Sequence, residues 1–208
     1  MPNYCSNYIS VRGKNSAEFL VKRLADAFDA GELCQAVIPV PEILRDTTSP
    51  TQPGDEAAAE QRQAETGFSN WYDFCVARWG TKWDISSQAE CERDEDGLGF
   101  NGTFDTAWAP PMGVVEQMVE DGLEVTLYYN EPGMSFVGKF EDGNDFCYDY
   151  GGLNSETVRG YIGDELDDFF AISEQMAEYE AENEEEELTE WLKDGIEKRE
   201  LVAGPAAL

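Results

Sequence analysis

The residues that could do chemistry in this chain are carboxylates and thiols, because the sequence contains no histidine. Histidine is the only side chain whose unperturbed pKa lies near neutrality, and it is the commonest metal ligand. Mechanisms that pair a serine or cysteine nucleophile with histidine are therefore excluded. The five cysteines are scattered, never form a CxxC pair, and lack the basic neighbours that activate a thiolate. We expect inert or buried thiols in a reducing compartment, and we predict that the protein is not an enzyme and needs no cofactor.

One segment partly matches a calcium-binding loop. Glu92, Asp94, Asp96 and Gly97 fall at positions one, three, five and six of an EF-hand, but Thr103 stands where the bidentate glutamate belongs. A hairpin turn over 94–97 explains this pattern better. The phosphate-binding patterns GxxxxGK[ST] and GxGxxG do not occur. We therefore predict no metal site, although a metal-dependent protein built on carboxylates stays as a second alternative.

Acidity is the strongest signal in the chain. Asp and Glu number 44 against 14 Lys and Arg, which gives a formal net charge of -30. Such a charge repels nucleic acid and anionic lipid. The chain starts without a basic and apolar leader, and no later segment approaches the roughly 20 apolar residues that span a bilayer. We expect a cytoplasmic protein that binds neither nucleic acid nor membrane.

The acidic residues concentrate near the C-terminus, where 160–192 contains no Lys or Arg. Apolar residues such as Leu166, Phe169 and Met176 recur there at helical spacing. This pattern predicts two acidic amphipathic helices, or one that is interrupted near Asn183. The carboxylates that we expect to contact a partner are Asp164, Glu165, Asp167, Asp168, Glu174, Glu178, Glu182, Glu185 and Glu186.

The acidic segment has two interpretations. It is a solvated helix face, or it imitates DNA. Duplex DNA carries one negative charge per roughly 1.7 Å of axis, and helix neighbours three or four residues apart hold carboxylates roughly 5 to 6 Å from one another. Charge alone favours neither interpretation.

The remaining pattern is typical of an α+β protein. Strands are predicted at 8–12, 88–93, 99–106, 123–129, 135–140 and 145–150, an extended segment at 34–40, and helices at 69–79 and 112–120. A further helix is predicted from an N-cap at Ser16 to Gly31. The segment 46–66 is predicted to be a mobile surface insertion. Helices among hairpins favour an antiparallel sheet with helices on one face.

The segment Trp79-Gly80-Thr81-Lys82-Trp83-Asp84 is conspicuous, because two tryptophans flank a short polar turn. Such rings are costly unless they are packed. Lys82 is expected to neutralise a carboxylate or to lie over a ring. Alternatively, the segment forms part of a recognition surface.

Six short motifs occur in a recognisable order: residues 1–5 (MPNYC), 38–41 (IPVP), 71–73 (WYD), 79–84 (WGTKWD), 106–111 (TAWAPP) and 131–136 (EPGMSF). Together they resemble the YubB-type ferredoxin-like family of bacteriophages and conjugative plasmids. Tyr4 stands where that family usually has Trp, and Ser135 where a second Gly is common. The resemblance implies a ferredoxin-like α+β domain over 1–158, with no known catalytic residues. We assign 159–200 to an acidic helical extension and 201–208 to a disordered tail.

These observations lead to a functional hypothesis. We expect a phage or mobile-element accessory protein that inhibits a host DNA-binding defence protein, such as a restriction or CRISPR component. The partner would be a host protein with a basic DNA-binding groove; whether the chain forms homo-oligomers stays open. The alternative is a protein-binding module, or a chaperone for a basic partner, that uses aromatic or hydrophobic surface.

Overall fold

The computed structural model describes residues 3–14, 17–85 and 89–186. The chain divides into two compact units, Met1–Gly151 and Gly152–Leu208. Each unit is described separately. None of the described helices combines the length and the apolar character needed to cross a bilayer.

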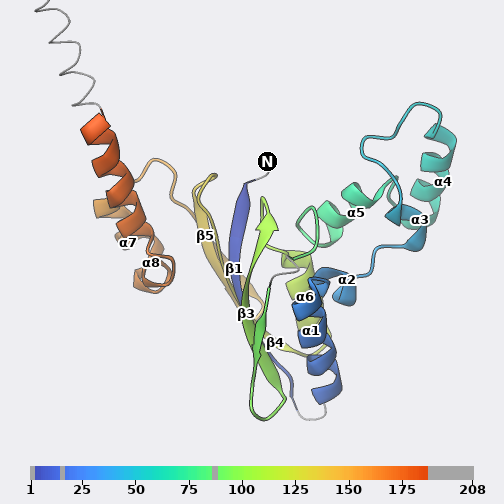
Figure 1. Cartoon of the computed structure of the whole chain (residues 1–208), viewed down its shortest axis with the longest axis horizontal. Helices are drawn as coiled ribbons and strands as arrows, with labels where there is room; N and C mark the ends of the chain where they lie inside the picture. Colours follow the sequence, from blue (N-terminus) through green and yellow to red (C-terminus); the bar gives the residue numbers. More distant parts are fainter. Residues whose placement is uncertain (1–2, 15–16, 86–88, 187–208) are drawn as a thin grey trace, which may run out of the picture. The chain divides into compact units, whose positions relative to one another are not determined.

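The first unit is built on a six-stranded sheet with the order β2-β3-β1-β4-β5-β6, in which every pairing is antiparallel (Figure 1). Its strands are β1 (Tyr4–Arg12), β2 (Cys91–Arg93), β3 (Gly99–Ala107), β4 (Glu124–Glu131), β5 (Phe136–Glu141) and β6 (Asn144–Asp149). β1 lies between β3 and β4 and pairs with β3 over its whole length. The predicted α+β class and antiparallel sheet are confirmed.

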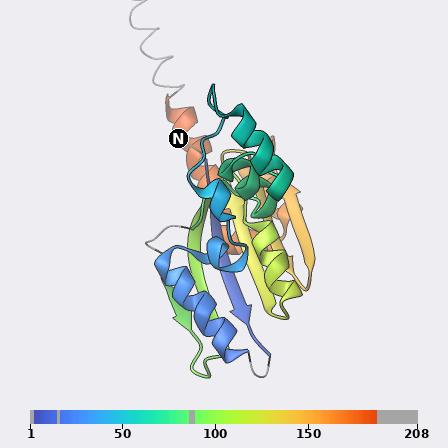
Figure 2. The ribbon, with the colours of Figure 1, turned by 90° about the vertical axis from the view of Figure 1, so that its right-hand side faces the viewer.

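Helices cover one face of this sheet (Figure 2). Alternate residues of β1, including Ile9 and Val11, are buried against α1 (Glu18–Ala30) and α6 (Met112–Glu120). Phe28 of α1 makes edge contacts with Phe100 and Phe104 of β3, with ring centroids 5.9 and 5.6 Å apart. Full burial of a side chain of this size stabilises the fold by about 1.5–3 kcal/mol. The predicted helix at 112–120 is confirmed.

The segment 34–40 was predicted to be extended, and this prediction is wrong. The structure has a short helix there, α2 (Leu33–Val37). The carboxylate of Asp84 accepts hydrogen bonds from the backbone N–H groups of Cys34 and Gln35, at 2.8 Å each. A partner fifty residues away therefore satisfies the first turn of the helix, which local propensity could not indicate.

The segment 46–66 contains regular structure. α3 (Glu42–Arg45) precedes it, and α4 (Glu56–Thr66) fills its second half before α5 (Trp71–Arg78) begins. Arg62 of α4 is buried, and it donates to the carboxylate of Asp55 at 2.5 Å and to the carbonyl oxygen of Ser69 at 2.7 Å. The predicted N-cap Ser16 lies outside the described residues, and α1 begins at Glu18. The predicted turn at 94–97 is confirmed, since Gly97 N–H donates to the Asp94 carbonyl oxygen at 3.0 Å.

The second unit consists of helices: α7 (Ser155–Ile162), α8 (Asp164–Phe170) and a helix over 172–186. The chain breaks at Gly163 (φ 89°) and Ala171 (φ 52°). The predicted interruption near Asn183 is wrong, because the last helix continues through that residue. The unit begins at Gly152, whereas the predicted boundary after 158 falls within α7. The tail predicted to be disordered, 201–208, lies outside the described residues.

Candidate protein-binding surfaces

The helix over 172–186 displays the clearest row of carboxylates. Glu174, Glu178 and Glu182 are exposed and follow one another every four residues, so they share one side of the helix roughly 6 Å apart along its axis. Glu185 and Glu186, also exposed, extend the row. Within the described part of the chain, no Lys or Arg forms an ion pair with these five residues. Among the described residues, no ion pair offsets the charge of this row.

The carboxylates of α8 differ, because one arginine of α7 gathers three of them. Arg159 lies 2.7 Å from Asp164, 2.8 Å from Asp168 and 3.1 Å from Asp167. Hydrogen bonding to Asp168, and then to Asp164, raises the pKa of Arg159 above its usual value. Glu165 is exposed on the same helix. The charge of α8 is therefore partly neutralised within the unit.

Asp167 holds the helices of this unit together. It is only 2% exposed. Its carboxylate accepts hydrogen bonds from the backbone N–H of Ser173 at 2.7 Å and from the Ser173 hydroxyl at 2.6 Å, in addition to the Arg159 contact. These bonds satisfy the start of the helix that follows the break at Ala171. Of the nine predicted contact residues, Asp167 is the one that is buried, so it is not available to a partner.

Glu180 has a similar structural role that the sequence pattern did not reveal. Its carboxylate accepts from the backbone N–H of Ser155 at 2.9 Å and from the Ser155 hydroxyl at 2.6 Å, at the N-terminus of α7. These hydrogen bonds lower the pKa of Glu180. The last helix is thereby fixed against α7.

The tryptophan-rich segment 79–84 has one side that builds the fold. Trp79 is buried and donates from Nε1 to the Ile38 carbonyl oxygen at 2.7 Å. The buried hydroxyl of Thr81 bridges the backbone carbonyl and N–H of Ala107, at 3.1 and 3.0 Å. Asp84 caps α2, and burial raises its pKa although three backbone N–H groups donate to it.

The other side of the segment is partly exposed and aromatic. The ammonium of Lys82 lies 4.6 Å from the ring centroid of Trp83, 5.4 Å from that of Trp108 and 5.9 Å from that of Tyr72. Trp108 is 39% exposed and has a left-handed backbone, with φ 69°. A left-handed conformation costs a non-glycine residue roughly 1–2 kcal/mol. We name Tyr72, Lys82, Trp83 and Trp108 the aromatic cluster.

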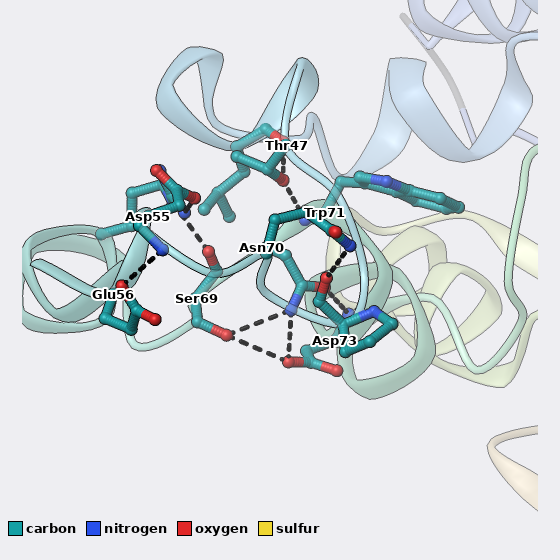
Figure 3. Close-up of polar contacts among 12 residues, drawn as sticks. Thr47, Asp55, Glu56, Ser69, Asn70, Trp71 and Asp73 are labelled. Carbon is teal, nitrogen blue, oxygen red and sulfur yellow. Dashed lines mark hydrogen bonds and ion pairs between the residues drawn. The ribbon is translucent and has the colours of Figure 1, made fainter. Parts of the chain in front are cut away.

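A polar network positions the helix that carries Tyr72 (Figure 3). Asn70, 3% exposed, caps α5 by accepting the Asp73 N–H at 3.0 Å, and it donates back to the Asp73 carboxylate at 2.8 Å. The Trp71 N–H donates to the hydroxyl of Thr47 at 2.9 Å, and Ser69 donates to Asp73 at 3.2 Å. These hydrogen bonds therefore fix the start of α5.

The thiols form no evident site. Burial raises the pKa of Cys5 and of Cys75 to about 12, and that of Cys34 well above its usual value. The predicted burial is confirmed for these three thiols, whereas Cys147 is exposed. Over 3–14, 17–85 and 89–186, no group of three or more His, Cys, Asp or Glu side chains is placed to hold a metal ion.

Comparison with known families identifies the fold. Residues 78–193 match the model of a family described as the ferredoxin-like domain in Api92-like protein. The chain belongs to this family. The Api92-like match confirms the predicted ferredoxin-like domain, and it includes segment 79–84 as well as α7 and α8.

One solved structure of an Api92 protein is similar to this chain. The crystal structure of a protein api92 from Yersinia pseudotuberculosis shares 13% identity and covers 74% of this chain and 99% of its own, with a TM-score of 0.39. At that TM-score the likeness adds nothing to the family assignment. No curated protein matches the chain.

Proposed function

We propose that this Api92-like protein binds a basic, DNA-binding host protein through the exposed carboxylates of its C-terminal helical unit and thereby inhibits it. The observation that carries the proposal is the row of Glu174, Glu178 and Glu182 on one continuous helix, extended by Glu185 and Glu186. Regularly spaced carboxylates that form no ion pair with a described Lys or Arg suit a groove lined with basic residues.

Repulsion among these carboxylates supports a binding role more than a role in solvation alone. Like charges at four-residue spacing destabilise a helix by about 0.2–0.5 kcal/mol per pair, so the row of glutamates destabilises this helix in the free protein. A basic groove would remove that repulsion. A net charge of -30 would also accelerate encounter with a cationic partner, and the acceleration would weaken with salt because the Debye length is about 8 Å at physiological ionic strength.

The proposal extends to the origin of the protein. We place it among the YubB-type proteins of bacteriophages and conjugative plasmids, with a restriction or CRISPR component as its target. The six ordered motifs support this placement. Such an accessory protein would act in the host cytoplasm.

The aromatic cluster favours one rival function, a protein-binding module that does not imitate DNA. Trp108 keeps 39% of its surface exposed in a strained conformation, and tryptophan is frequent among residues that dominate binding energy. A truncation near residue 160 would cut through α7, so the two functions are better separated by charge substitutions in the full chain.

The test is capture of partners from a bacterial lysate by the tagged full-length chain, at low and high salt, followed by DNA-binding assays on each purified partner. Mimicry predicts that the partner binds DNA, that the chain displaces the DNA, and that capture falls at high salt. The triple variant Glu174→Gln, Glu178→Gln, Glu182→Gln should lose most of the capture.

The matched control removes three exposed glutamates of the first unit: Glu60→Gln, Glu116→Gln and Glu120→Gln. This variant has the same net charge as the triple variant of the last helix. Comparing the two therefore distinguishes binding by the local row of glutamates from attraction by the overall negative charge. Equal loss of capture in both variants would refute a binding row on the last helix. A partner that is held equally at both salt concentrations would favour the aromatic rival.

A further inference from the structure

Beside the aromatic cluster, the first unit has a cavity that is wide open to solvent and lined mainly by apolar surface. It has a volume of about 230 Å³, and its apolar wall includes the rings of Trp71, Trp79 and Trp83. Its charged lining consists of Arg45, Lys82 and Asp84. Ligand sites are usually concave and apolar, with a few polar groups that orient the ligand.

Lys82 is unusual among the cations near this cavity. Arg45 is already paired, with Glu42 at 2.8 Å. Over the described residues, no carboxylate lies within ion-pair distance of Lys82, and its contacts are the rings of the aromatic cluster. In a chain with 44 acidic residues and 14 basic ones, a half-buried lysine without a carboxylate partner is not explained by composition.

The carboxylate in the cavity lining, that of Asp84, already accepts hydrogen bonds within the fold. Asp84 accepts from the backbone N–H groups of Cys34, Gln35 and Ile85 at 2.8, 2.8 and 2.9 Å. These donors compensate its charge and leave it poorly suited to neutralise Lys82. Arg45 is paired with Glu42, so Lys82 is the cation of this lining that has no carboxylate partner among the described residues.

The rings position the ammonium and leave its N–H groups accessible to solvent or to an anion. A lysine ammonium has three donors, and contacts with ring faces do not replace an anionic acceptor. The fold also retains the strained backbone of Trp108, whose ring borders Lys82. Strain kept at a partly exposed residue is more typical of a binding site than of a core.

We propose that this cavity binds a small carboxylate with an apolar body, such as an arylalkanoic acid. The carboxylate pairs with Lys82, and the apolar body lies against the tryptophan wall. The lining residues all belong to the first unit, and the proposal does not depend on the function proposed for the acidic helices.

The test uses 3-phenylpropionate and its neutral amide as probes of the full-length chain at constant ionic strength. Saturation-transfer NMR and tryptophan fluorescence are followed to 10 mM ligand. We expect the carboxylate to bind at least tenfold more tightly than the amide, because a charge-assisted hydrogen bond is lost in the amide. Lys82→Gln should abolish that preference, and Lys82→Arg should keep it.

The control is Arg23→Gln, which removes one exposed cation from α1 and should leave the tenfold preference unchanged. Each variant is compared with the wild-type thermal unfolding curve, so that misfolding is recognised. The proposal is overturned if wild-type protein binds neither probe by 10 mM, or binds both equally. It is also overturned if Lys82→Gln retains the preference.

Discussion

Asp167 and Asp168 contact the same arginine, but their burial differs, and this contrast yields a sharp prediction. Asp167 is 2% exposed at its side chain, whereas Asp168 is 65% exposed. Asp167→Asn replaces one carboxylate oxygen with an amide donor that faces Arg159 and Ser173. We expect the second unit to be destabilised mainly by loss of this buried acceptor.

The magnitude follows from the contacts. Asp167 accepts two hydrogen bonds from Ser173 and one from Arg159. A hydrogen bond to a charged group contributes about 1.5–3 kcal/mol, and breaking a buried ion pair costs about 3–5 kcal/mol. Arg159 keeps Asp164 and Asp168 as partners, so we expect a loss of about 2–4 kcal/mol. This corresponds to a roughly 30- to 1,000-fold larger population of the opened helical unit.

Native-state hydrogen exchange, followed by mass spectrometry on peptides from 155–182, measures this population directly. The whole-chain unfolding curve is less suitable, because two units need not unfold together. The control, Asp168→Asn, should change the opening free energy by about 0.5 kcal/mol or less. Equal effects of the two substitutions, or unchanged exchange in Asp167→Asn, would refute the structural role assigned to Asp167.

Three further predictions concern the first unit. At pH 8, iodoacetamide should modify the exposed Cys147 first and should reach Cys5, Cys34 and Cys75 only after unfolding. Burial raises the pKa of Cys5 and Cys75 from 9.0 to about 12, so the folded chain keeps protons that the unfolded chain releases. The free energy of unfolding should therefore fall as the pH rises from about 9 to about 12; urea titrations that show no such fall would contradict this assignment. Gly113→Ala should destabilise the unit by about 1–3 kcal/mol, because the added Cβ would overlap the carbonyl oxygen of Arg78. The comparison is Gly160→Ala in α7, where a Cβ meets no atom within 4 Å and thermal unfolding should show no loss of stability.

Much of the fold was accessible from the sequence because its strands alternate and its helices carry clear apolar faces. β1 shows why, since its buried and exposed residues follow the period of two that the residue types predict. The helix at 112–120 was predicted with its observed limits, because two prolines precede it and Gly122 follows it. α2 was missed because its first turn depends on Asp84, a contact that no local pattern encodes.

The candidate sites, like the fold, were predictable from the sequence only in part. Spacing alone places Glu174, Glu178 and Glu182 on one side of a helix, because the helical period is local. It could not distinguish Asp167 from Asp168, which are adjacent and chemically identical. Only the packing of α7 and of the helix after Ala171 shows that one is buried and the other exposed.

By itself, the sequence determined an acidic, histidine-free α+β chain with its charge concentrated toward the C-terminus. Composition and periodicity are properties of the chain, so they need no tertiary contacts. The tertiary structure alone decided which carboxylates remain available. It also decided that segment 79–84 has two sides: Trp79, Thr81 and Asp84 build the fold, while Lys82 and Trp83 join Tyr72 and Trp108 at the surface. The physical reason is that burial and pairing depend on residues far apart in the chain.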